Sequence, residues 1–224
     1  MNPNIKNILK STVVLAIVAF SASFVLSHVY RITHPNILKQ AKEKQERALS
    51  VVLPGYSNIT EKKIKIDEKD FQYWIGKKWE DGKTRKGYAF IAEKAGYSGL
   101  VKTMVGVNEL GIILGISILQ QTETPGLGAR CIELPAMETF WGYLFGESST
   151  DDVESILPWF QEQFNGLNAN NRIEILKKGD WNPDLRNELL KKNAISAITG
   201  ATITTRAVRD GIETGFQLLG MAEK

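Results

Sequence analysis

The sequence has one cysteine, two histidines and little excess charge. A single thiol, Cys131, forms no disulfide within the chain and cannot supply the ligands of an iron–sulfur cluster or of a cysteine-based zinc site. Lys and Arg number 28 against 25 Asp and Glu, with no long basic block, which argues against nucleic-acid binding. We therefore predict no metal site, and any redox chemistry must use an organic cofactor.

With 224 residues, of which 43% are hydrophobic, the chain is long enough to bury the core of one domain. Residues 11–30 carry no formally charged side chain, and as a helix they would span roughly 30 Å, the thickness of a bilayer's hydrocarbon core. We predict a transmembrane helix there. Lys6 and Lys10 would also suit a cleaved signal peptide, so that alternative stays open. Positive side chains flank both ends, so charge counts do not determine the orientation.

Three β-rich segments, residues 88–92, 100–107 and 112–119, are separated by short turns, which predicts an antiparallel meander. Helical spacing predicts helices over 136–145, 151–164 and 204–221. An exposed helix over 37–53, either a stalk or a packing helix, should end at Pro54-Gly55. The predicted fold is α+β, an antiparallel-rich sheet covered by helices. Its parts are a tail (1–10), the membrane helix (11–30), a juxtamembrane helix with a connecting segment (31–86) and one domain (87–224).

Residues 122–129 (TETPGLGA) form a glycine-rich loop directly after a predicted strand. Gly126 and Gly128 let the backbone turn sharply and approach a planar ligand or a phosphate without a Cβ in the way. The loop is not a dinucleotide fingerprint, because the third glycine of that pattern would fall at Cys131. The residues alone are equally compatible with a structural turn.

Residues 196–208 (SAITGATITTRAV) precede and enter the last predicted helix and contain four threonines within seven residues. Hydroxyls and free amide groups at a helix start suit a phosphate. Simple N-capping by Thr204 or Thr205 would also explain one of these threonines.

The segment 199–208, together with Glu123–Gly128 and the turn 96–99, closely resembles the FMN-binding domain family shared by the G subunit of the Rnf complex and the C subunit of the sodium-translocating NADH:quinone reductase. The resemblance extends to the order of membrane helix, charged helix and domain. It implies that a flavin transferase, using FAD, joins FMN to the hydroxyl of Thr202 through a phosphoester. The family motif usually begins with Asp where this chain has Ser196. In the family, that Asp is expected to help the transferase recognise or activate its target.

The resemblance implies a set of cofactor-binding residues around this attachment point and no catalytic residue: Thr202, Thr199, Gly200, Ala201, Glu123, Thr124, Gly126, Leu127 and Gly128. Trp141 is a candidate for stacking on the flavin, although a Trp on an apolar helix is more often a packing residue. The implied protein is an electron carrier in the cell membrane, with its domain on the outer face. It would work with other subunits of a complex that couples ferredoxin:NAD electron transfer to sodium or proton movement.

Two other interpretations remain from the sequence. The chain length and the sequence 206–208 favour the Rnf protein over its counterpart in the quinone reductase, which stays as an alternative. A membrane-anchored structural domain that has lost its flavin is the second alternative, and Ser196 is the feature that favours it.

Overall fold

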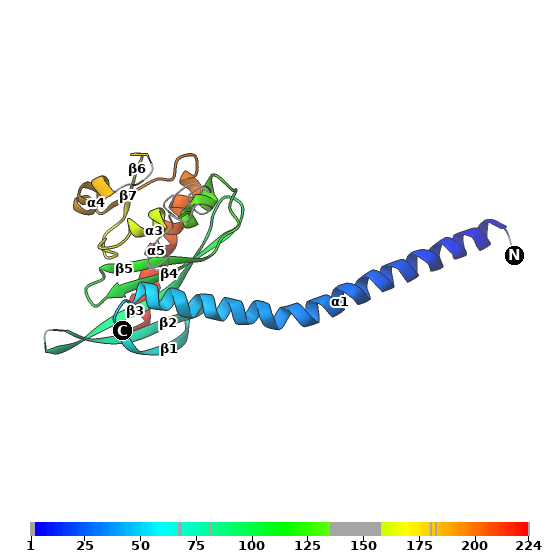
Figure 1. Cartoon of the computed structure of the whole chain (residues 1–224), viewed down its shortest axis with the longest axis horizontal. Helices are drawn as coiled ribbons and strands as arrows, with labels where there is room; N and C mark the ends of the chain where they lie inside the picture. The colour runs from blue at the N-terminus through cyan, green and yellow to red at the C-terminus, as the bar shows by residue number, and fades with distance from the viewer. Residues whose placement is uncertain are drawn as a thin grey trace, which may run out of the picture. The chain divides into compact units, whose positions relative to one another are not determined.

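The computed structural model describes residues 3–66, 69–80, 82–134, 158–179, 181 and 183–223 (Figure 1). The chain divides into two compact units, Met1–Lys44 and Gln45–Lys224. The first unit consists of helix, and the second holds a five-stranded sheet, a two-stranded sheet and the C-terminal helix. This is the α+β architecture that the sequence predicts.

Helix α1 (Pro3–Val52) is one helix of 50 residues that includes both the predicted membrane helix and the predicted helix over 37–53. Its stretch Asn7–Val52 is long and apolar enough to cross a membrane. Large apolar side chains there are exposed, among them Phe20 (74%) and Leu26 (71%), which water would disfavour and lipid would accept. The helix ends at Val52, just before Pro54-Gly55 as predicted, and Gly55 adopts a φ of 76°.

Five antiparallel strands follow in sequence order, each paired with the next. They are β1 (Ser57–Ile66), β2 (Lys69–Glu80), β3 (Lys83–Ala95), β4 (Leu100–Asn108) and β5 (Ile113–Gln120). The last three strands and their turns confirm the predicted meander. The predicted connecting segment before residue 87 instead contains β1 and β2, which belong to the same sheet. β1 is a mostly exposed edge strand rich in Lys, and these charges hide its pattern in the sequence.

The sheet buries apolar side chains on both faces. Alternation along β3 places Phe90 and Ala92 in the large core and Ala89 in a smaller cluster on the other face. The last turn of α1 closes the smaller cluster with Ala48 and Val52. A Cβ at Gly106 of β4 would overlap the Val52 carbonyl oxygen, so glycine permits this close contact. The predicted helix over 37–53 therefore packs on the sheet at its C-terminal end.

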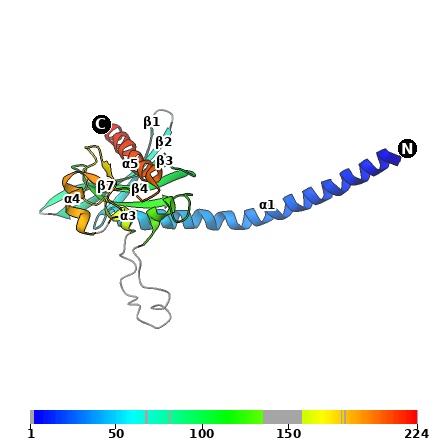
Figure 2. The ribbon, with the colours of Figure 1, turned by 90° about the horizontal axis from the view of Figure 1, so that it is seen from above.

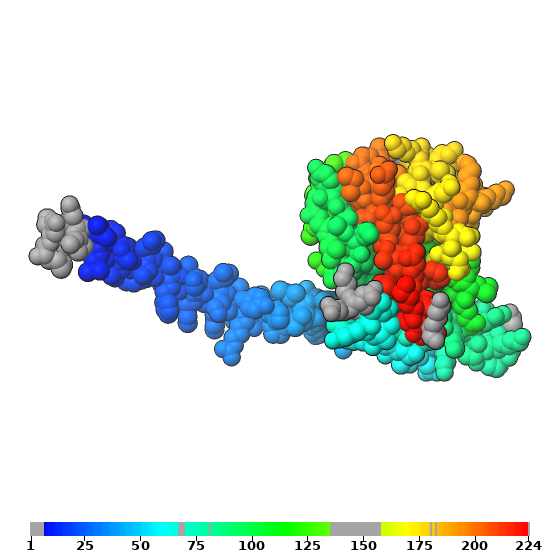
Figure 3. All heavy atoms as spheres, turned by 180° about the vertical axis from the view of Figure 1, so that it is seen from behind, coloured from blue at the N-terminus to red at the C-terminus, as the bar shows by residue number. Residues whose placement is uncertain are grey.

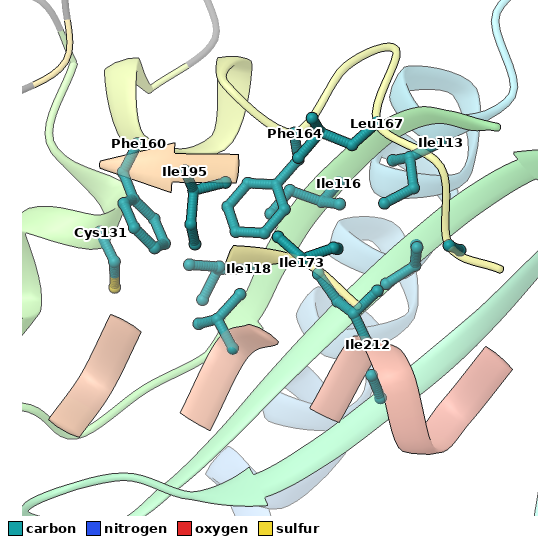
Figure 4. Packing of buried hydrophobic residues seen from close by; sticks show 14 of the residues in the cluster. Ile113, Ile116, Ile118, Cys131, Phe160, Phe164, Leu167, Ile173, Ile195 and Ile212 are labelled. Atoms are coloured by element: carbon teal, nitrogen blue, oxygen red, sulfur yellow. The ribbon is translucent and has the colours of Figure 1, made fainter. Parts of the chain in front are cut away.

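The opposite face of the sheet carries helix α5 (Thr202–Ala222), which packs against β3 and β4 and lies on the outside of this unit (Figures 2 and 3). Between them lies the large core, in which side chains from β5, β7 and α5 converge (Figure 4). Tyr73 of β2 donates a hydrogen bond to Glu223 Oε1 (2.8 Å), which fixes the far end of α5. α5 begins two residues earlier than predicted.

The remaining elements complete the large core beside α5. They are η1 (Gly128–Ile132), α3 (Trp159–Glu162), β6 (Glu174–Leu176), η3 (Pro183–Leu185), α4 (Arg186–Lys191) and β7 (Ala194–Ser196). β6 and β7 pair in parallel. The predicted helix over 136–145 and the first half (151–157) of the one over 151–164 lie outside the described residues, and α3 lies within the second half of the latter. Trp141 also lies outside them.

Candidate functional site

The two motifs that the sequence singles out meet at one cleft of about 480 Å³. The loop after β5 contributes one wall, and the start of α5 with the residues before it contributes the other. The cleft is lined by Tyr97, Glu123, Thr124, Leu127, Gly128, Gly200, Ala201, Thr202, Ile203 and Thr204. Its volume lies within the range of small-molecule sites in proteins.

Glu123 joins three segments of the chain at the base of this cleft. Its side chain is only 5% exposed. Oε1 accepts a hydrogen bond from the Ser98 N–H (3.0 Å), and Oε2 accepts one from the Tyr97 N–H (3.3 Å). The Thr204 hydroxyl of α5 donates to the same Oε2. One carboxylate thus ties the turn 96–99 and the first turn of α5 to the glycine-rich loop.

Gly128 explains part of the glycine-rich motif. A Cβ at this position would lie 2.5 Å from Thr204 Oγ1 and 2.6 Å from Glu123 Oε2, so any side chain would force the two walls apart. Gly126 is different, because it needs a left-handed backbone (φ 74°) but has open space around it. It does not line the cleft.

The other wall is a tight turn that leads into α5. Gly200 adopts a φ of 76°, and its missing Cβ leaves room for Leu127, whose Cδ2 would be 2.9 Å away. The Thr205 hydroxyl accepts a hydrogen bond from the Ile198 N–H (3.1 Å) and donates one to the Ala201 carbonyl (3.2 Å). Thr205 is completely buried, so this side chain fixes the turn from within.

Thr202 is the first residue of α5 and is half-buried at the cleft wall. The capping position is Ala201, which makes no side-chain capping bond. The alternative that Thr204 or Thr205 caps the helix is therefore wrong, because both lie inside the helix and bond elsewhere. A helix start without a capping side chain retains unpaired N–H groups and positive dipole character, which suit an anionic group.

Ser196 stands at the end of β7 and is fully buried. The buried side chain of Gln163 accepts a hydrogen bond from the Ser196 N–H (2.7 Å) and donates one to its carbonyl (3.3 Å). The Ser196 hydroxyl donates to the Gly179 carbonyl. In this fold, Ser196 is thus a buried residue whose hydrogen bonds fix the segment before Thr199. No pattern in the sequence indicated that Gln163 would be its partner.

Cys131 lies in η1, next to the glycine-rich wall, and is completely buried. Burial raises the pKa of its thiol to about 12, and the nearby charge of Glu123 adds to this shift. The thiol therefore stays protonated at physiological pH, and it is a packing group rather than a nucleophile.

Seven of the nine expected site residues line the cleft, whereas Thr199 and Gly126 do not. Thr199 is exposed at the edge of the turn. Three further lining residues were not expected at the site, namely Tyr97, Ile203 and Thr204. Tyr97 stands in the turn 96–99 that belongs to the family resemblance, which is the one signal that pointed to it.

A mixed sheet-and-helix domain with one cleft between a glycine-rich loop and a helix start defines a small-molecule-binding domain. The chain belongs to the FMN-binding domain family, whose model matches residues 96–217. A second model, the RnfG N-terminal region, matches residues 1–52. Together the two matches include α1 and both walls of the cleft.

Two curated relatives match nearly the whole chain. The G subunit of the proton-translocating ferredoxin:NAD(+) oxidoreductase complex of Clostridium ljungdahlii is 28% identical over 91% of this chain and 86% of its own length. The G subunit of the ion-translocating oxidoreductase complex of Shewanella piezotolerans is 26% identical over 93% and 87%. The crystal structure of the C subunit of Na(+)-translocating NADH-quinone reductase from Parabacteroides distasonis is similar at a TM-score of 0.47, with 16% identity over 80% of this chain and 91% of that one.

Proposed function

We propose that the chain is the covalently flavinylated electron-carrier subunit of a membrane complex that couples electron transfer between ferredoxin and NAD to sodium or proton translocation. The observation that carries this proposal is the cleft in which the Thr202 segment and the glycine-rich loop face each other. The relatives named as G subunits support the complex, and they favour it over the quinone-reductase alternative.

The residues of the cleft fit FMN. The uncapped start of α5 suits a phosphate. Exposed apolar surface from Leu127 (45%) and Ile203 (51%) suits a flat aromatic ring system. When bound, FMN supplies the redox chemistry, and the polypeptide supplies its position and electrostatic surroundings.

Thr202 is the proposed attachment point. In the proposed transfer, Thr202 Oγ forms a bond to the phosphorus of the FMN half of FAD while the diphosphate bond breaks. AMP leaves, and the hydroxyl proton passes to a base of the flavin transferase. Thr202 is half-buried beside exposed Thr199 and Gly200, so the transferase can reach it on the folded domain.

The long apolar α1 and the match to the RnfG N-terminal region support a single-pass membrane protein. We place the domain on the outer face, where a covalent bond would retain a cofactor that no surrounding FMN pool could replace. Its partners would be the membrane subunits of the complex and, during maturation, the flavin transferase. A reporter enzyme active only outside the cytoplasm, fused after Lys224, tests the orientation, and an inactive fusion at normal expression would contradict it.

Fluorescence in a denaturing gel tests the attachment, because only a covalently bound flavin remains with the unfolded chain. Full-length protein produced with a flavin transferase should give a fluorescent band, and Thr202→Val should lose it. Thr199→Val is the matched control, since it removes a nearby exposed hydroxyl and should keep the band. A wild-type chain without fluorescence would favour the alternative of a domain that has lost its flavin.

A further inference from the structure

Glu123 is a buried carboxylate without a basic partner among the described residues. Those residues place no Lys, Arg or His nitrogen in an ion pair with it, whereas the carboxylates of Glu93, Glu133 and Glu188 each have at least one such partner. The undescribed segment 135–157 contains no Lys, Arg or His in its sequence. Only two backbone N–H groups and the Thr204 hydroxyl stabilise this charge among the residues that the structure describes.

The charge of Glu123 acts on neighbouring groups as well as on its own hydrogen-bond donors. Its side chain lines the cleft that also contains Thr202. A buried charge is screened by water much less than an exposed one, so its field reaches across a cleft of this size. Beside burial, which has the larger effect, the charge of Glu123 raises the pKa of the Cys131 thiol.

We propose that Glu123 lowers the reduction potential of the cofactor held in this cleft, relative to a neutral side chain at the same place. The inference rests on the proposed function, because it assumes a flavin attached at Thr202. A flavin that accepts electrons becomes more negative, and a fixed negative charge beside it disfavours that change. Charges placed near the ring are one of the means by which proteins tune flavins.

Thr204 modulates this effect. Its hydroxyl donates directly to Glu123 Oε2 and so offsets part of the negative charge. Removing that hydroxyl leaves the carboxylate with one hydrogen-bond donor fewer. The two side chains should therefore shift the potential in opposite directions when each is changed alone, whereas a general loosening of the cleft would shift both variants the same way.

Spectroelectrochemical titration of the full-length, flavinylated protein tests the proposal. Glu123→Gln should raise the midpoint potential of the flavin. We expect the equilibrium constant for its reduction to rise on the order of tenfold, which corresponds to a rise in potential of about 59 mV for one electron. Glu133→Gln is the matched control, because it removes the same charge at an exposed site (52%) where water screens it, and its shift should be smaller. Thr204→Val should lower the potential.

An unchanged or lowered potential in Glu123→Gln would overturn the inference while leaving flavin attachment intact. If Glu123→Gln does not fold, Thr204→Val decides, and a potential equal to or above that of the wild type would contradict the proposal. A wild-type chain without covalent flavin would contradict the proposed function itself, a result visible in the denaturing gel before any titration.

Discussion

The two walls of the cleft come from distant parts of the chain and are built in different ways. The wall after β5 is organised around one buried carboxylate, that of Glu123, with Gly128 packed directly against it. The wall at the start of α5 is stabilised by hydrogen bonds between the buried side chains of Gln163 and Thr205 and the backbone before the helix. Thr202 remains accessible at the surface of this wall.

This difference indicates which residues of the site maintain its structure and which are available for attachment of the cofactor. In the first wall, glycine and glutamate are needed so that three segments can meet, and their loss should disturb the fold. In the second wall, the buried groups set the shape of the turn, whereas the Thr202 hydroxyl has no structural partner among the described residues. Changes at Thr202 should therefore affect attachment and leave stability nearly unchanged.

Gly128→Val should have the largest effect, because its side chain would collide with both Glu123 and Thr204 and push the walls apart. We expect a loss of about 3 kcal/mol in the free energy of unfolding. Urea denaturation of the variant measures this, and the flavin absorption of any folded fraction should also shift. Wild-type stability would show that the two walls are not in contact at this point.

Gln163→Leu tests the support behind the second wall. The change leaves the buried N–H and C=O of Ser196 without the partners they have now, at a cost of about 2 kcal/mol. Thermal unfolding measures the loss. Gln72→Leu, which removes an exposed amide from β2, is the control and should have little effect. Equal stability of the two variants would contradict the role of Gln163.

Gly126→Ala sharpens the contrast between the two glycines of the loop. The site has open space, so the only penalty is the strain of a left-handed backbone, about 1 kcal/mol. Because Gly126 does not line the cleft, flavinylation and the flavin spectrum should match the wild type. A shifted spectrum would show that Gly126 contacts the cofactor.

Cys131 gives an effect that is confined to high pH and is absent at neutral pH. The thiol ionises near its ordinary pKa of 9.0 in the unfolded chain but only near about 12 in the folded domain. The folded state is therefore favoured by this group below pH 9, and its contribution is lost as pH rises toward 12. Compared with the wild type, Cys131→Ala should lose less stability over that window in denaturation series. Parallel curves would contradict a buried thiol.

Short-range patterns explain what the sequence could predict. The meander from β3 to β5 follows from apolar segments with tight turns, and both cleft motifs carry local conformational signatures in glycine and threonine. β1 was missed because exposed charges dilute its alternation. The bond between Glu123 and Thr204 joins residues 81 positions apart, and no local pattern reveals such a contact. The same reason hid Gln163, which lies 33 positions from Ser196.

The location of the flavin on Thr202 is the central claim, and peptide mass spectrometry tests it most directly. Trypsin should release residues 193–206 as one peptide, which contains four threonines. Fragmentation should place the added mass, that of FMN less one water, on Thr202. The same mass on Thr199, Thr204 or Thr205, or an unmodified peptide from protein matured with the transferase, would contradict the account.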